Sequence, residues 1–116
     1  MSVSRAERVS GLLRRELADI LQREFEYELP RGLISLTDVE VARDLSHAKV
    51  YVAILESEQA SEIIAFLNEN AGQVRRELGT RIRLRLTPSL KFIHDSSSES
   101  GQRIEELLAA SRKPRD

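Results

Sequence analysis

The apolar residues near the start of the chain recur at spacings of three and four, which is the period of an α-helix with one buried face. This pattern predicts a helix over residues 4–24, and a helix with such an apolar stripe must pack against another layer. Pro30 and Gly32 break the pattern and allow the chain to turn into that layer, which we expect to be a β-sheet. The stripe consists of Val9, Leu12, Leu13, Leu17, Ile20, Leu21 and Phe25.

Two stretches with alternating apolar residues follow, and such alternation is typical of β-strands with one buried face. The first extends from Ile34 to Val41, and the second covers residues 48–55. The polar segment 43–46 between them predicts a β-hairpin. Thr37 and Asp38 shift the alternation of the first strand, and this shift predicts a β-bulge.

A second helical stripe covers residues 63–78, and Gly72 interrupts it. Glycine in a helix interior costs about 1 kcal/mol relative to alanine, so we expect a kink with a fresh helix start. Asn70 is expected to be the N-cap of the new helix, with Gln73 as its capping-box partner. The alternative is that Gly72 only allows close packing against the sheet. Gly79 is predicted to end the helix.

A third strand is predicted to begin at residue 81, because arginines there alternate with aliphatic residues. Pro88 interrupts this strand, but Leu90 and Phe92 keep its parity. Three guanidinium groups would then lie on one face of the sheet, where they could bind phosphate or simply be solvated. The alternating residues are Arg81, Ile82, Arg83, Leu84, Arg85 and Leu86.

Charge is distributed unevenly along the chain, although the net charge is only −1. Residues 71–94 contain six basic residues and one acidic residue, Glu77. The segment 56–69 contains four glutamates and neither lysine nor arginine. One face of the fold can therefore be basic and bind nucleic acid, while an acidic face could instead recruit a protein partner.

Several classes of function receive no support from the sequence. With no cysteine and only two histidines, thiolate chemistry is excluded and a metal site is not expected. His94, Asp95 and the serines after them are interpreted as a strand end with turn residues, since triad members usually come from separate segments. No secretion signal or membrane span is evident, which favours a cytoplasmic location. We expect a protein that is not an enzyme and needs no cofactor.

At this point the chain resembles the ribosome-binding factor A family, in residues that follow the family pattern in order over nearly the whole length. The resemblance is carried by Arg8-Val9, the helix end at 20–24, Val-Glu-Val-Ala-Arg-Asp-Leu-Ser-His-Ala-Lys-Val-Tyr-Val at 39–52, Val-Arg-Arg-Glu-Leu-Gly at 74–79, Arg-Leu-Arg at 83–85, Pro88, Leu90, Phe92, Asp95-Ser96 and Gly101. It implies an α+β, type II KH-like fold and binding to 16S ribosomal RNA. Ordinary KH domains clamp the RNA backbone with a Gly-x-x-Gly loop. The resemblance implies an Ala-x-Gly kink in place of that loop. The aligned triplet here is Asn70-Ala71-Gly72, which departs from the family pattern at Asn70.

The combined prediction is a monomeric assembly factor for the small ribosomal subunit. It would bind free small subunits through 16S RNA and promote late RNA maturation; the alternative is a protein-interaction adaptor that uses its acidic helix surface. We expect one domain over residues 1–110, with the order helix, strand, strand, helix, kinked helix, strand and short C-terminal helix, and a flexible tail at 111–116. The predicted RNA-binding residues are Asn70, Ala71, Gly72, Arg75, Arg76, Arg81, Arg83, Arg85 and Lys91, with auxiliary contacts at Arg5, Arg8, Arg43 and Lys49.

Overall fold

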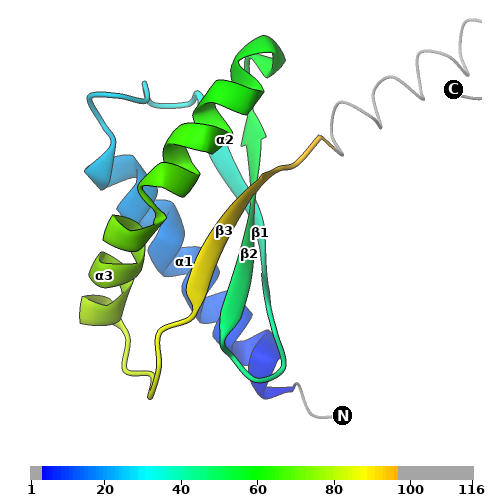
Figure 1. The fold of residues 1–116 in the computed structure, drawn as a ribbon, viewed down its shortest axis with the longest axis vertical. Helices are drawn as coiled ribbons and strands as arrows, with labels where there is room; N and C mark the ends of the chain where they lie inside the picture. The colour runs from blue at the N-terminus through cyan, green and yellow to red at the C-terminus, as the bar shows by residue number, and fades with distance from the viewer. Residues whose placement is uncertain (1–3, 97–116) are drawn as a thin grey trace, which may run out of the picture.

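The computed structural model describes residues 4–96 of the 116-residue chain. The predicted C-terminal helix and the tail at 111–116 lie outside the described residues. The described elements follow the predicted order (Figure 1). They are α1 (Arg5–Glu24), β1 (Ile34–Val41), β2 (His47–Ile54), a short 3-10 helix (Ser57–Gln59), α2 (Ala60–Glu69), α3 (Ala71–Arg81) and β3 (Ser89–His94).

Helix α1 begins at a capping box. The Ser4 hydroxyl accepts a hydrogen bond from the Glu7 backbone N–H at 3.1 Å, and the Glu7 carboxylate accepts one from the Ser4 N–H at 3.2 Å. The helix buries the predicted stripe except for Leu12, which is 38% exposed at its edge. The prediction for this helix is therefore confirmed.

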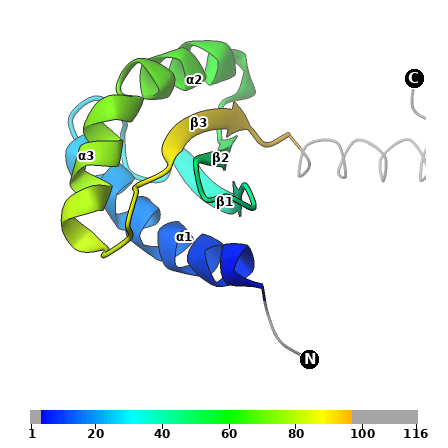
Figure 2. The same ribbon diagram turned by 60° about the horizontal axis from the view of Figure 1, so that its bottom comes forward.

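The sheet has the strand order β1-β2-β3. Strands β1 and β2 form the predicted antiparallel hairpin, and their register shifts between Leu36 and Asp38, which confirms the predicted bulge. Strand β3 runs parallel to β2, and the two helices α2 and α3 make the connection between them. The three longer helices all lie on the same side of the sheet, and within residues 4–96 no helix covers its other face, called the open face below (Figure 2).

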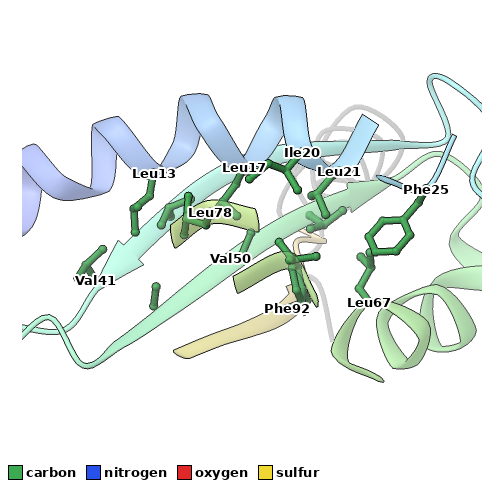
Figure 3. Packing of buried hydrophobic residues seen from close by; sticks show 14 of the residues in the cluster. Leu13, Leu17, Ile20, Leu21, Phe25, Val41, Val50, Leu67, Leu78 and Phe92 are labelled. Atoms are coloured by element: carbon green, nitrogen blue, oxygen red, sulfur yellow. The ribbon is translucent and has the colours of Figure 1, made fainter. Parts of the chain in front are cut away.

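The core lies between that helical layer and the sheet (Figure 3). Leu13 and Leu17 of α1, Val50 of β2, Leu78 of α3 and Phe92 of β3 are all at most 1% exposed. The rings of Phe25 and Phe66 pack edge to face with their centroids 5.2 Å apart, and this contact joins the end of α1 to α2. Aliphatic burial is the main driving force for this arrangement.

The prediction of a strand beginning at residue 81 is wrong, as is the prediction that Gly79 ends the helix. Helix α3 continues to Arg81, and strand β3 begins only at Ser89. In the register, Ser89 is opposite His47, the first residue of β2, so the residues before Ser89 have no strand to pair with. Gly79 instead leaves room for the chain before β3, because a Cβ there would lie 3.2 Å from the Thr87 hydroxyl.

Arg81 explains why α3 continues past Gly79. Its guanidinium contacts three carboxylates: Asp19 at 2.7 Å and Glu16 at 3.4 Å from α1, and Glu77 at 3.2 Å, one turn earlier in α3. The Arg81 side chain is only 22% exposed. The hydrogen bond from Arg81, and then that from Arg23, hold the pKa of Asp19 below its usual value. This cluster fixes the end of α3 against the middle of α1.

Asn68 closes the outer edge of β3. Its side-chain amide donates to the Phe92 carbonyl at 3.0 Å and accepts from the Phe92 N–H at 2.8 Å. A single side chain of α2 thus takes the place of a neighbouring strand at this position, which reduces the exposed pairing capacity of an edge strand.

We expect Asn68→Ala to lower the free energy of unfolding by about 1 kcal/mol, because two backbone groups of Phe92 lose their partner. Urea denaturation measures this. Asn68→Asp is the informative second variant, since it keeps the acceptor and loses the donor. If Asn68→Ala were as stable as the wild type, the amide would not support the edge of β3.

We expect Arg81→Gln to lower the melting temperature at pH 7, because three neighbouring carboxylates lose their shared cation. A carboxylate with a lowered folded-state pKa stabilises the fold above its unfolded pKa and loses that contribution as the pH falls through the folded pKa. The difference between wild type and variant should therefore shrink as the pH falls below about 4. Arg83→Gln, at an exposed site, is the control, and an equal effect of both variants would contradict the role of the cluster.

Candidate nucleic-acid interface

The predicted kink is present between α2 and α3, but its chemistry differs from the prediction. The Asn70 side chain donates to the Phe66 carbonyl at 2.8 Å, and no side-chain cap bond is made to α3. Gln73 donates instead to Glu24 at the end of α1, at 2.7 Å. The predicted capping box is therefore wrong. Asn70 satisfies a carbonyl at the end of α2 rather than an N–H at the start of α3.

Gly72 lies on the exposed surface of the first turn of α3. Apart from its chain neighbours and the backbone of its own helix, no described heavy atom lies within 4 Å of a Cβ built at Gly72. The alternative that this glycine permits close packing against the sheet is therefore wrong. The open space leaves the backbone beside Ala71 and Gly72 accessible to a ligand that needs close approach.

Arg75 and Arg76 follow on the same helix, and both side chains are exposed. The Arg75 guanidinium donates to the Thr87 carbonyl through Nε at 3.0 Å and Nη2 at 2.7 Å, so it also fixes the loop before β3. Arg76 makes no ion pair within 4.0 Å among residues 4–96. Arg76 is the more available phosphate ligand of the two.

Arg83 and Arg85 lie in the loop over residues 82–88 rather than on a strand. Both are exposed, whereas Ile82 is buried and Leu84 is half-buried, so the alternation predicted from the sequence persists without strand pairing as far as Leu84 and ends at Leu86, which is 60% exposed. Arg81, which was predicted beside them, faces the three carboxylates of α1 and α3. These contacts separate it from Arg83 and Arg85, which pair with no carboxylate within residues 4–96.

Lys91 lies on the open face of the sheet, on the opposite side from α3. It is the register partner of Lys49 on β2, and both side chains alternate with buried residues of their strands. The Lys49 ammonium is 4.0 Å from Glu40 on β1. The structure thus distributes the predicted basic site over two faces.

The remaining auxiliary residues lie near the β1–β2 turn. Arg5 and Arg8 are exposed on the first turns of α1, and Arg43 is exposed in the turn itself. Arg5 and Arg85 line the same surface hollow. The sequence does not indicate that these two arginines lie together, because nothing local shows that the loop 82–88 returns to the start of α1.

The segment His94–Asp95 ends β3, as predicted. His94 is the register partner of Val52, and the Asp95 N–H donates to the Val52 carbonyl at 2.8 Å. The Thr37 hydroxyl, at the bulge of β1, donates to the Asp95 carboxylate at 2.5 Å. These contacts fix the end of the strand to the hairpin.

Two further properties bear on function. None of the helices within residues 4–96 is long and apolar enough to cross a membrane. Across the same part of the chain, no three His, Asp or Glu side chains gather in a way that would hold a metal ion.

Comparison with known proteins identifies the family. The family model described as ribosome-binding factor A matches residues 5–108. A ribosome-binding factor A of Microcystis aeruginosa is 47% identical over 106 residues, which cover 90% of this chain and 83% of the relative.

Solved structures agree with this match. The crystal structure of ribosome-binding factor A from Thermus thermophilus superposes with a TM-score of 0.66 at 25% identity, covering 77% of this chain and 94% of the other. A homology model of the Thermus thermophilus ribosome-binding factor A, fitted into the cryo-electron microscopy map of a 30S complex with that factor, gives a TM-score of 0.62 at 30% identity, covering 76% of this chain and 92% of the other. The KH-like α+β fold expected from the resemblance is confirmed, and this chain belongs to the ribosome-binding factor A family.

Proposed function

We propose that this chain is an assembly factor that binds free small ribosomal subunits, contacts their 16S RNA and promotes late maturation of that RNA. The observation that carries the proposal is the similarity to the Thermus thermophilus factor whose coordinates were fitted into the map of a 30S complex. The family match over residues 5–108 supports the same role for nearly the whole chain. We take residues 1–110 as one RNA-binding domain and 111–116 as a tail.

The proposed primary RNA surface consists of the kink at Asn70-Ala71-Gly72, the exposed arginines of α3 and the loop over residues 82–88. Arg76, Arg83 and Arg85 are exposed and are not paired with a carboxylate within residues 4–96. Planar guanidinium groups suit bidentate contacts to phosphate. Arg75 has a second role, because it already holds the Thr87 carbonyl, and Arg81 acts by positioning the loop. Lys91 and Lys49 supply a secondary contact on the open face.

The acidic segment 56–69 indicates which side of the protein faces away from RNA. Glu56, Glu58, Glu62 and Glu69 are all exposed, and no cation lies within 4.0 Å of them in the described part of the chain. Phosphate would be repelled there, so α2 is expected to face away from RNA. The same uncompensated charge would suit a protein partner, which is the adaptor alternative.

The proposed mechanism is a shift in population and makes or breaks no bond, so the protein is not an enzyme and uses no cofactor. A factor that binds an immature RNA conformation more tightly than the mature one favours the rearrangement only through that difference in affinity. It then leaves when the subunit matures. The proposal places the protein in the cytoplasm as a monomer.

Binding to free small subunits should weaken as salt increases, because released counterions contribute to phosphate binding. We expect Arg76→Glu and Arg83→Glu each to lower affinity and to reduce the slope of log K against log salt by about 1. Arg31→Glu, at an exposed arginine of the α1–β1 loop, changes the charge equally and is the control. Co-sedimentation with small subunits, large subunits and whole ribosomes over a salt series measures this. Failure to bind small subunits at low salt would refute the proposal and favour the adaptor.

Gly72→Ala separates stability from RNA contact. The substitution should raise the free energy of unfolding by up to about 1 kcal/mol, because alanine favours the helix and nothing obstructs its methyl group. Gly11→Ala is a matched control, since Gly11 is also exposed in a helix with no described atom within 4 Å of a Cβ. We expect both variants to be stabilised and only Gly72→Ala to bind small subunits more weakly. Equal binding by both would show that RNA does not approach the kink closely.

A further inference from the structure

The start of α1, the β1–β2 turn and the loop 82–88 lie at the lower end of the molecule in Figure 1. Residues from all three segments line one surface hollow. Its volume is about 280 Å³. We call it the hairpin-end hollow. Its lining residues are Arg5, Asp44, Leu45, Leu84, Arg85 and Leu86.

Leucines provide the apolar lining of the hairpin-end hollow. Leu45 and Leu84 are half-buried and pack against the core, whereas Leu86 is 60% exposed. Leu45 has φ = 64°, the left-handed conformation that turns usually give to glycine or asparagine. Leucine is rarely found in this conformation. Here its side chain adds apolar surface to the hollow, which a glycine at this position would not do.

Two cations lie at the hollow. Arg5 and Arg85 are exposed, and neither guanidinium is within 4.0 Å of a carboxylate in the range 4–96. They approach from different elements, α1 and the loop before β3. An anion bound between them would gain two charge-assisted contacts without displacing an existing ion pair.

Asp44 adds a fixed hydrogen-bond acceptor. The Ser46 backbone N–H and hydroxyl both donate to Asp44 Oδ1, at 3.0 and 2.6 Å. These bonds keep the pKa of the Asp44 carboxyl below its usual value, so it stays ionised at neutral pH. Beside a pocket, such a carboxylate favours a ligand that brings N–H donors and disfavours one that brings only a phosphate.

We propose that the hairpin-end hollow binds one unstacked nucleotide of the RNA whose base carries an exocyclic amino group. The base would pack on Leu84 and Leu86, its amino group would donate to Asp44, and its phosphate would lie between Arg5 and Arg85. The volume is close to the lower end of small-molecule pockets, which suits a single nucleotide. The inference rests on the proposed RNA function and adds a base preference to it.

The direct test uses the full-length chain with labelled leucine methyl groups, titrated with five-nucleotide single-stranded RNAs of only adenine, only cytosine or only uracil. We expect saturable shifts at Leu45, Leu84 and Leu86. Adenine and cytosine RNAs should bind at least about fivefold more tightly than uracil RNA, since uracil has no amino group. Asp44→Asn should remove most of that difference. Shifts confined to other leucines, or equal affinity for all three RNAs, would overturn the proposal.

A matched pair of variants tests the apolar wall. Leu86→Ser should weaken binding of the adenine RNA at least about fivefold. Leu55→Ser, at a 78% exposed leucine beyond the other end of β2, should leave it unchanged. Equal affinities of the two variants would refute the site. Co-sedimentation with small subunits distinguishes failure of the nucleotide site from failure of the proposed function. If the protein binds small subunits but no nucleotide binds in the hollow, only this inference is refuted. If the protein does not bind small subunits, the proposed function is refuted as well.

Discussion

The contact of Arg81 with carboxylates from α1 and α3 is the interaction on which the presentation of the basic surface depends. It fixes where α3 ends, and therefore where the loop 82–88 begins. Arg75 fixes the other end of that loop through the Thr87 carbonyl, and Gly79 leaves room for Thr87 there. Held at both ends, the loop presents Arg83 and Arg85 to solvent and reaches the start of α1. Arg81, which was predicted to bind RNA, thus positions Arg83 and Arg85, whose side chains are exposed.

Elements with strong local patterns could be predicted from the sequence. The stripe of α1, the bulge near Thr37 and the break at Asn70 all result from interactions between residues close in the chain. The end of α3 could not be predicted, because it depends on Glu16 and Asp19, more than sixty positions earlier. The start of β3 depends on where β2 begins, and the alternation from Arg81 to Leu86 carries no information about that. The gathering of Arg5 with Arg85 was missed for the same reason.

This chain differs from an ordinary KH domain at the edge of β3 and in the connection between α2 and α3. The Asn68 amide occupies the backbone groups of Phe92, and the connection between α2 and α3 is a kink closed by Asn70 rather than a loop. Asn68 therefore keeps the Phe92 N–H and carbonyl from contacting a base at this edge of the sheet. Both features leave the exposed guanidinium groups of α3 and the loop as the main RNA ligands in the proposed surface, which favours recognition of a folded RNA backbone.

The separation of charge between α2 and the arginine-bearing segment has a kinetic consequence. Although the net charge of the chain is only −1, the exposed glutamates of the segment 56–69 and the exposed arginines of the loop 82–88 lie at different ends of the described residues, and the field of a ribosomal RNA surface would act on them in opposite directions. The protein would arrive already rotated, with α2 directed outward. Encounters in the wrong orientation are then repelled before contact, so that selectivity begins during diffusion and not only in the bound state.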